Sequence, residues 1–260
     1  MNPVQGRRQD RLPHLSVVAA LVLSACSSPV SSPLTEAVAC LPPDTQAVAG
    51  VHLDRLRGKE RLPPAWSLVL DPFRSANLAL LAYNGSDILV IASGRFASAP
   101  PGAVLLKPEL ALAGSPAAIR AATGQHATGR TGVSDLVAQA APVINRDVWA
   151  VVRGSTRLPL PGNSANLNRL LALTRYTTGS AALGSADSAI RLEADGHCAT
   201  PESARGLEER LRALITFAKA AAKAPDLTSA LASTELRRDG SVVHLNLLAS
   251  PQAVQQLPGF

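Results

Sequence analysis

Residues 78–93, LALLAYNGSDILVIAS, place two apolar runs on either side of an Asn84-Gly85 pair. Asn-Gly between apolar runs is the strongest short signal for a β-hairpin, because a type I′ turn needs positive φ at both central residues. A similar arrangement recurs at 231–248, around an Asp-Gly pair. The two hairpins indicate antiparallel β-structure both early and late in the chain.

Working outward from these hairpins, apolar periodicity and turn residues predict the remaining elements. We expect strands at 45–56, 78–83, 88–93, 104–106, 110–113, 148–152, 180–184, 189–194, 231–237 and 242–248. We expect helices at 115–123, 133–144, 166–173 and 201–223, with further short helices after Pro63-Pro64 and Ser250-Pro251. The Ser-Pro pairs suit helix starts, since Ser caps a helix and Pro fits its first position.

The order strand, helix, hairpin, hairpin, short helix occurs twice. Ser115-Pro116-Ala-Ala-Ile matches Ser250-Pro251-Gln-Ala-Val, each after an apolar strand. We therefore expect an α+β fold of two similar halves, 45–145 and 146–260. Each half resembles a ferredoxin-like, split β-α-β unit with an added strand. Coincidence is the alternative, because Ser-Pro is a common helix start.

The first 25 residues have the organisation of an export signal. Three arginines come first, and a short apolar run from Leu15 to Leu23 follows. Leu23-Ser24-Ala25-Cys26 then resembles the lipobox of bacterial lipoproteins, in which a small-residue cleavage site precedes an acceptor Cys. An ordinary signal peptide or an N-terminal helix is the alternative interpretation.

The resemblance implies that Cys26 becomes the mature N-terminus, with a thioether-linked diacylglycerol and usually an amide-linked acyl chain such as palmitate. Several acyl chains hold a protein firmly on a membrane. Ser27 follows the Cys, and in lipoproteins of double-membraned bacteria a residue other than Asp there favours the outer membrane. Residues 26–44 begin rich in Ser and Pro, so we expect a tether.

Composition bounds the function of the 260-residue chain. With 47% hydrophobic and 17% charged residues, it is not a disordered protein. Its N-terminal apolar run is too short to span a bilayer, which excludes a polytopic membrane protein. The net charge is +6, of which residues 1–25 carry +2, leaving +4 for the mature chain. This modest charge does not indicate nucleic-acid binding. The layout and the Ser-Pro-x-Ala-Ile/Val element also loosely resemble secreted bacterial domains of unknown function.

The familiar catalytic motifs G-x-S-x-G, H-E-x-x-H, Walker A and C-x-x-C do not occur. We expect His52 and His244 to be strand-face or core histidines. His197 beside Cys198 lacks a second local ligand pair, so the sequence predicts no metal and no cofactor. The pair Glu208 and Glu209 sits among arginines, and we expect a solvated, charged helix face.

Two cysteines remain once Cys26 is acylated. Cys40 and Cys198 are candidates for a disulfide, because exported proteins meet an oxidising compartment. The alternative is two separate buried thiols, since a bridge needs Cα atoms within about 7 Å of each other.

Together these features predict a non-catalytic, lipid-anchored envelope protein, held through Cys26 and facing the periplasm from the outer membrane. It would act as a binding or assembly module, with an envelope protein as its candidate partner. The alternative is an envelope hydrolase whose active-site residues are dispersed along the chain, because such sites are recognised by geometry and not by sequence position.

Overall fold

The computed structural model describes residues 32–57, 70–159, 164–183 and 189–256. The described residues from Pro33 onward form one compact unit. Its strands are β1 Ala47–His52, β2 Ala76–Tyr83, β3 Ile88–Gly94, β4 Ala103–Lys107, β5 Leu110–Ala113, β6 Val148–Arg153, β7 Thr174–Ala182, β8 Ile190–Cys198, β9 Glu235–Asp239 and β10 Val242–Ala249. Its helices are α2 Pro33–Ala39, α3 Leu53–Leu56, η1 Asp71–Phe73, α5 Pro116–Ala127, α6 Ser134–Ala140, α7 Ser164–Leu171, α8 Pro201–Ala221, α9 Pro225–Ala232 and α10 Pro251–Gln256.

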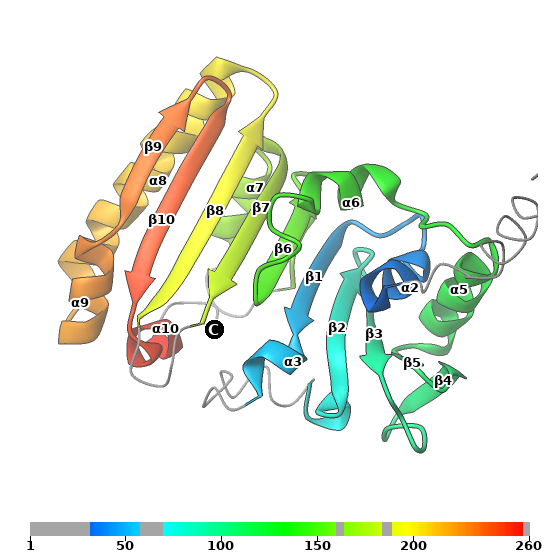
Figure 1. Ribbon diagram of the computed structural model, residues 1–260. Helices are drawn as coiled ribbons and strands as arrows, with labels where there is room; N and C mark the ends of the chain where they lie inside the picture. The colour runs from blue at the N-terminus through cyan, green and yellow to red at the C-terminus, as the bar shows by residue number, and fades with distance from the viewer. Residues whose placement is uncertain (1–31, 58–69, 160–163, 184–188, 257–260) are drawn as a thin grey trace, which may run out of the picture. The chain divides into compact units, whose positions relative to one another are not determined.

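The ten strands form a single sheet in the order β4-β5-β3-β2-β1-β6-β7-β8-β10-β9 (Figure 1). Every neighbouring pair is antiparallel. The predicted α+β class with antiparallel strands is therefore confirmed, and the structure adds that all ten strands belong to one large sheet. Counted outward from the central β1–β6 pair, the order is β1-β2-β3-β5-β4 on one side and β6-β7-β8-β10-β9 on the other. We call these five-strand sets the first-half and the second-half strands.

Local turn chemistry fixes the hairpins. The predicted Asn84-Gly85 turn joins β2 to β3, with Gly85 at a φ of 106°. The Asn84 side-chain oxygen accepts hydrogen bonds from the backbone N–H groups of Ser86 and Asp87, at 3.0 and 2.8 Å. Gly240, at a φ of 53°, lies in the turn between β9 and β10. A side chain at either glycine would be strained, because L residues rarely adopt positive φ.

Four of the first-half strands, β1, β2, β3 and β5, are buried on both faces, whereas the edge strand β4 is partly exposed. One face carries Leu80 and Ile91, which form the largest apolar cluster with residues of α2, α5 and α6. The other face carries Val90 and Ala79, which pack with Phe73 of η1 and residues of α3. Apolar side chains on both faces suit strands covered on both sides.

Trp149 of β6 fills the centre of the larger cluster and is 1% exposed. It pairs with Gly50 on the neighbouring β1. A Cβ atom added to Gly50 would lie 2.2 Å from the indole ring. The absence of a side chain at Gly50 therefore gives the Trp149 ring its place on the sheet.

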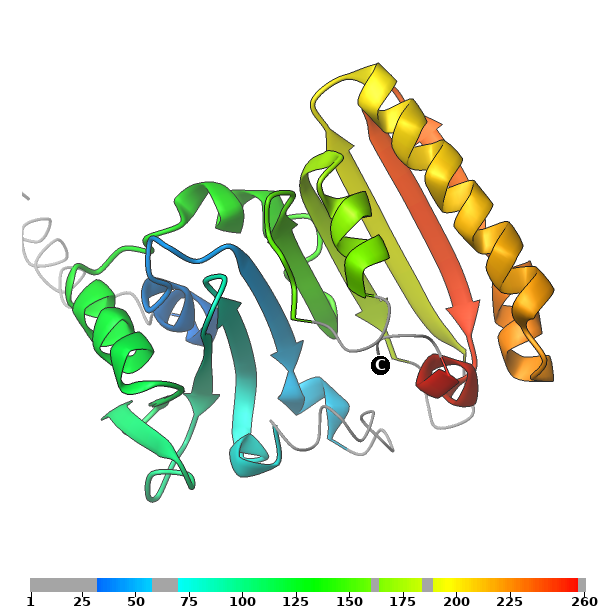
Figure 2. The same cartoon turned by 180° about the vertical axis from the view of Figure 1, so that it is seen from behind.

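Among the second-half strands, β7 to β10 are covered by described helices on one face only. Figure 2 shows α7 and α8 lying across these strands. Leu207 of α8 packs with Val243 and Cys198, and Gly196 faces it so closely that an added Cβ would lie 2.7 Å from a Leu207 methyl. Helices α9 and α10 contribute a smaller cluster on the same strands.

The structure differs from the sequence-based predictions in four places, and the helix expected after Pro63-Pro64 lies outside the described residues. The strand expected at 45–56 ends at His52, and Leu53–Leu56 form α3. The predicted tether, 26–44, contains helix α2, whose Ala37 is fully buried together with Cys40. Strand β7 begins at Thr174, before the expected 180. The strand expected at 231–237 is instead the end of α9 followed by β9, because Pro225 starts a separate helix after α8.

Candidate functional site

The second-half strands carry polar side chains on the face opposite α7 and α8. Side chains two residues apart along a strand share a face, and the pairing register aligns them across strands. Three rows result: Tyr176, His197 and Val242; Thr178, Asp195 and His244; and Ser180, Glu193 and Asn246. We call these nine residues the polar face. In Figure 1 no helix of the described residues lies over this side of β8, β10 and β9.

The middle row contains a histidine–carboxylate pair. His244 Nδ1 and Asp195 Oδ1 are 2.7 Å apart, and both side chains are half-buried, with 26% and 39% exposed. A carboxylate in this position orients the imidazole ring, so that Nε2 is directed to a ligand or a proton. The pair has the geometry of a base and its orienting group.

His197 lies one row away and stacks on Tyr176, with ring centroids 4.3 Å apart and ring planes 18° apart. Burial lowers the pKa of His197 below its usual value; Asp195 opposes this change, and His244 adds to it. Burial favours the uncharged form of an imidazole because the charged form loses its hydration. His197 is therefore mainly a neutral, stacked ring at pH 7.

The third row is organised around a carboxylate. Glu193 Oε2 accepts hydrogen bonds from Ser180 Oγ at 3.4 Å and from Arg146 Nη2 at 3.2 Å. The Ser180 hydroxyl thus donates to Glu193. Within the described residues, no hydroxyl group is hydrogen-bonded to an imidazole. A serine nucleophile activated by histidine would need such a contact.

Of the other candidate residues in the described part of the chain, His52 lies away from this surface. Cys26 lies outside the described residues. His52, at the end of β1, contacts the Ile144 carbonyl oxygen through Nε2 at 3.0 Å. His244 is on a strand face, in the pair described above.

Cys40 and Cys198 are both free and buried, in different apolar clusters. In the structure the two residues are therefore separate buried thiols, with no disulfide between them. Burial raises the pKa of the Cys40 thiol to about 12, with a smaller contribution from Glu36, and burial also raises the pKa of Cys198. Both thiols fill apolar space, since Cys is among the most buried residue types.

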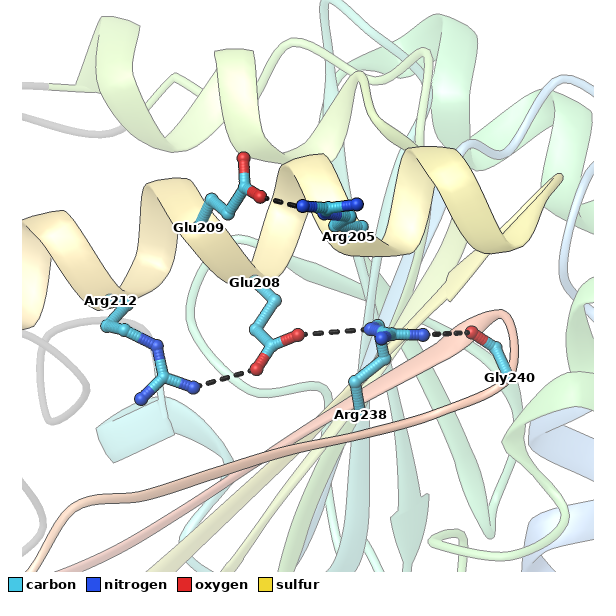
Figure 3. A network of polar contacts seen from close by, with 6 residues as sticks. All are labelled: Arg205, Glu208, Glu209, Arg212, Arg238 and Gly240. Atoms are coloured by element: carbon cyan, nitrogen blue, oxygen red, sulfur yellow. Dashed lines mark hydrogen bonds and ion pairs between the residues drawn. The ribbon is translucent and has the colours of Figure 1, made fainter.

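Glu208 and Glu209 lie on α8 in a network of ion pairs (Figure 3). Glu209 pairs with Arg205 at 3.0 Å, and both side chains are exposed. Glu208 pairs with Arg212 at 2.7 Å and with Arg238 of β9 at 3.0 Å. These bonds lower the pKa of Glu208, Arg212 contributing most. Glu208 thereby ties α8 to the sheet edge.

Sequence reasoning did not single out Asp195 or Glu193. The signal was present in β8, where polar Glu193, Asp195 and His197 alternate with Leu192, Ala194 and Gly196. Period-two alternation of this kind marks a strand with one polar face. The partner of Asp195 lies 49 positions away, at His244, and only the strand register identifies it.

Within the described residues, no group of three or more His, Cys, Asp and Glu side chains could hold a metal ion. Nor does any helix there have the length and apolar character needed to cross a membrane. Comparisons of the chain with protein-family models, with curated proteins and with solved structures gave no match.

Proposed function

We propose that the chain is an exported lipoprotein of the cell envelope that acts as a non-catalytic binding or assembly module. The observation that carries the proposal is Leu23-Ser24-Ala25-Cys26 at the end of a basic and then apolar segment. Acyl chains on Cys26 would hold the protein on the membrane, and Ser27 favours the outer membrane, with the folded part facing the periplasm.

Membrane extraction followed by mass spectrometry of the N-terminal peptide tests the anchor. We expect an acylated peptide that begins at Cys26. Cys26→Ser should move the protein out of the membrane fraction. Cys198→Ala is the matched control, because it also removes a cysteine but should leave the protein membrane-bound. An unmodified Cys26, or a mature chain that begins elsewhere, contradicts the proposal.

The polar face is the candidate binding surface. It presents imidazole, carboxylate and amide groups beside the stacked ring of Tyr176, while the hydroxyl groups of Thr178 and Ser180 are buried. Such groups suit a polar envelope partner that forms hydrogen bonds, and the half-buried Asp195–His244 pair is already oriented to meet one. An envelope protein fits this description. Nucleic acid does not, because acidic Glu193 and Asp195 lie within the surface.

Capture from solubilised envelopes with a matched pair of variants tests this surface. Asp195→Lys reverses a charge in the polar face, whereas Glu209→Lys makes the same reversal on α8. We expect bound partners to be lost with Asp195→Lys and retained with Glu209→Lys. Equal capture by both variants contradicts a role for the polar face.

The second candidate function is a hydrolase, and the Asp195–His244 contact is the observation that favours it. A fluorophosphonate probe, which labels activated serines, separates the two functions. As a binding module the protein stays unlabelled. Labelling that disappears in Ser180→Ala or His244→Gln would favour the hydrolase.

The finer description of the fold also belongs to this proposal. The two halves, 45–145 and 146–260, are copies of one ferredoxin-like, split β-α-β type unit. The matching strand orders on either side of the β1–β6 pair support this, as does the parallel alignment of β8 and β9 on either side of β10. Against a simple copy, β3 and β4 are joined by a loop, whereas β8 and β9 are joined by α8 and α9.

An experimental structure tests the duplication. We expect β1 to β5 to superpose on β6 to β10 strand by strand. A different strand order in the two halves would rule it out.

A further inference from the structure

The C-terminal half of α8 presents an apolar surface that no described element covers. Phe217 is 75% exposed and Leu214 is 44% exposed. Phe217 lines a shallow, open hollow with Ala213, Thr216 and Ala220. Glu209 and Arg212 complete the lining, and each is engaged in an ion pair, with Arg205 and with Glu208. The buried residues of α8, Ala204 and Leu207, both lie in its N-terminal half. The second half of the helix is therefore held to the sheet more loosely and faces outward.

The charge along the same segment has one sign. Between Arg210 and Lys223 the sequence has four basic residues and no acidic residue. Arg212 is neutralised by Glu208, as Figure 3 shows. Arg210, Lys219 and Lys223 have no ion pair within the described part of the chain. Arg210 lies two turns before Phe217 on the same side of α8, whereas Lys219 projects from the opposite flank and Lys223 follows the end of the helix. This half of α8 therefore carries three positive charges without an ion pair among the described residues.

We infer that this surface of α8 docks on an anionic phospholipid bilayer. Basic residues beside an exposed aromatic on a helix match the chemistry of a membrane interface, where the ring enters the headgroup region and the cations meet lipid phosphates. Charge complementarity singles out this occupant, because Arg210, Lys219 and Lys223 on a second copy of the chain would repel those on the first. The inference does not require acylation of Cys26.

Vesicle sedimentation tests the inference on the full-length, unlipidated Cys26→Ser chain. The probes are phosphatidylcholine vesicles with and without phosphatidylglycerol. We expect stronger binding to the phosphatidylglycerol vesicles, and weaker binding as the salt concentration rises. Lys219→Gln with Lys223→Gln should weaken binding about thirtyfold, from about fivefold for each charge. Phe217→Ala should weaken it about tenfold.

Two double variants serve as controls for the Lys219→Gln, Lys223→Gln variant. Lys219→Arg with Lys223→Arg retains both charges and should bind like the parent. Arg191→Gln with Arg237→Gln removes two exposed charges from strands β8 and β9, on the side of the sheet away from α8, and should change binding less than twofold. All of these positions are exposed, and circular dichroism verifies that the variants fold.

Equal binding of the parent and the Lys→Gln variant to anionic vesicles would overturn the inference. So would self-association that Phe217→Ala abolishes, measured by sedimentation velocity without vesicles, because the occupant would then be a second copy. Either result leaves the lipidation test at Cys26 unaffected, since every chain in this experiment lacks the acceptor cysteine.

Discussion

The two halves of the sheet share one strand order but cover their faces differently. Strand β2 places Leu78, Leu80 and Ala82 in an apolar cluster under α2 and α5. Strand β7, at the equivalent place in the other half, carries Tyr176, Thr178 and Ser180 on the polar face. The strand order alone therefore does not decide which faces are buried. Helices cover the apolar faces, whereas the polar face has no described helix over it and is open to water or to a partner at β8 and β10, since Thr178 and Ser180 of β7 are buried.

The largest expected effect tests the two-sided burial of the first half. Leu80 is fully buried between strands and helices. Leu80→Ala should lower the free energy of unfolding by about 2–5 kcal/mol, because the lost apolar contact leaves a cavity. Urea denaturation followed by circular dichroism measures the change.

Leu248→Ala supplies the second-half control. Leu248 is 45% exposed on β10, and its truncation should change the free energy of unfolding by less than about 0.5 kcal/mol. Similar losses for the two variants would contradict the difference in burial between the halves.

A second test addresses the boundary between the halves, where β1 meets β6. Gly50→Ala inserts a methyl group at 2.2 Å from the Trp149 ring, so the ring must shift. We expect a loss of about 1–3 kcal/mol in the free energy of unfolding, as for other overpacked cores. Adding Trp149→Phe should recover part of the loss, which a double-mutant cycle would detect. If the effects of Gly50→Ala and Trp149→Phe on the free energy of unfolding simply add, the contact between the new methyl group and the Trp149 ring is not the cause of the loss.

Local residues made part of this architecture predictable. Asn84-Gly85 and the Asp-Gly pair at 239–240 carry their turn geometry in their own φ preferences, so both turns are where the sequence predicts them, although β9 begins at Glu235 and not at 231. Ser115 and Thr200 cap α5 and α8 by accepting hydrogen bonds from backbone N–H groups three residues on. Each of these signals acts within a few residues.

Helix α2 and the side-chain pairs of the polar face were not predicted from the sequence, because both depend on contacts between residues far apart in the chain. Helix α2 lies in a Ser/Pro-rich segment, and what stabilises it is the burial of Ala37 against strands far along the chain. In the candidate site, alternation in β8 reveals a polar face, but the partners of Asp195 and Glu193 depend on strand register and on β10. Short-range patterns cannot specify which strand becomes the neighbour of another.

A third test concerns the ion pairs that attach helix α8 to strand β9 in the second half. Glu208 is 20% exposed and joins Arg212 and Arg238, so charge as well as apolar contact attaches α8 to β9. Glu208→Gln should cost up to about 1 kcal/mol of unfolding free energy at low salt, and less at high salt. Glu209→Gln, which removes one exposed ion pair, should cost less than about 0.5 kcal/mol. Equal costs would contradict a linking role for Glu208.

The smallest effect lies on the polar face itself, at His197. Burial lowers the pKa of His197 below the usual value of 6.5. Because the unfolded chain then binds a proton more readily than the folded one, the stabilisation from neutral His197 is full above about pH 6.5 and is lost as the pH falls through the lowered pKa. Between pH 7 and pH 5, the urea midpoint of the wild type should therefore fall further than that of His197→Gln, which cannot titrate at this position. NMR titration of the imidazole gives the pKa directly. A pKa at or above 6.5 would mean that the attraction of the Asp195 carboxylate outweighs the effect of burial on His197. It would also mean that water reaches this part of the polar face.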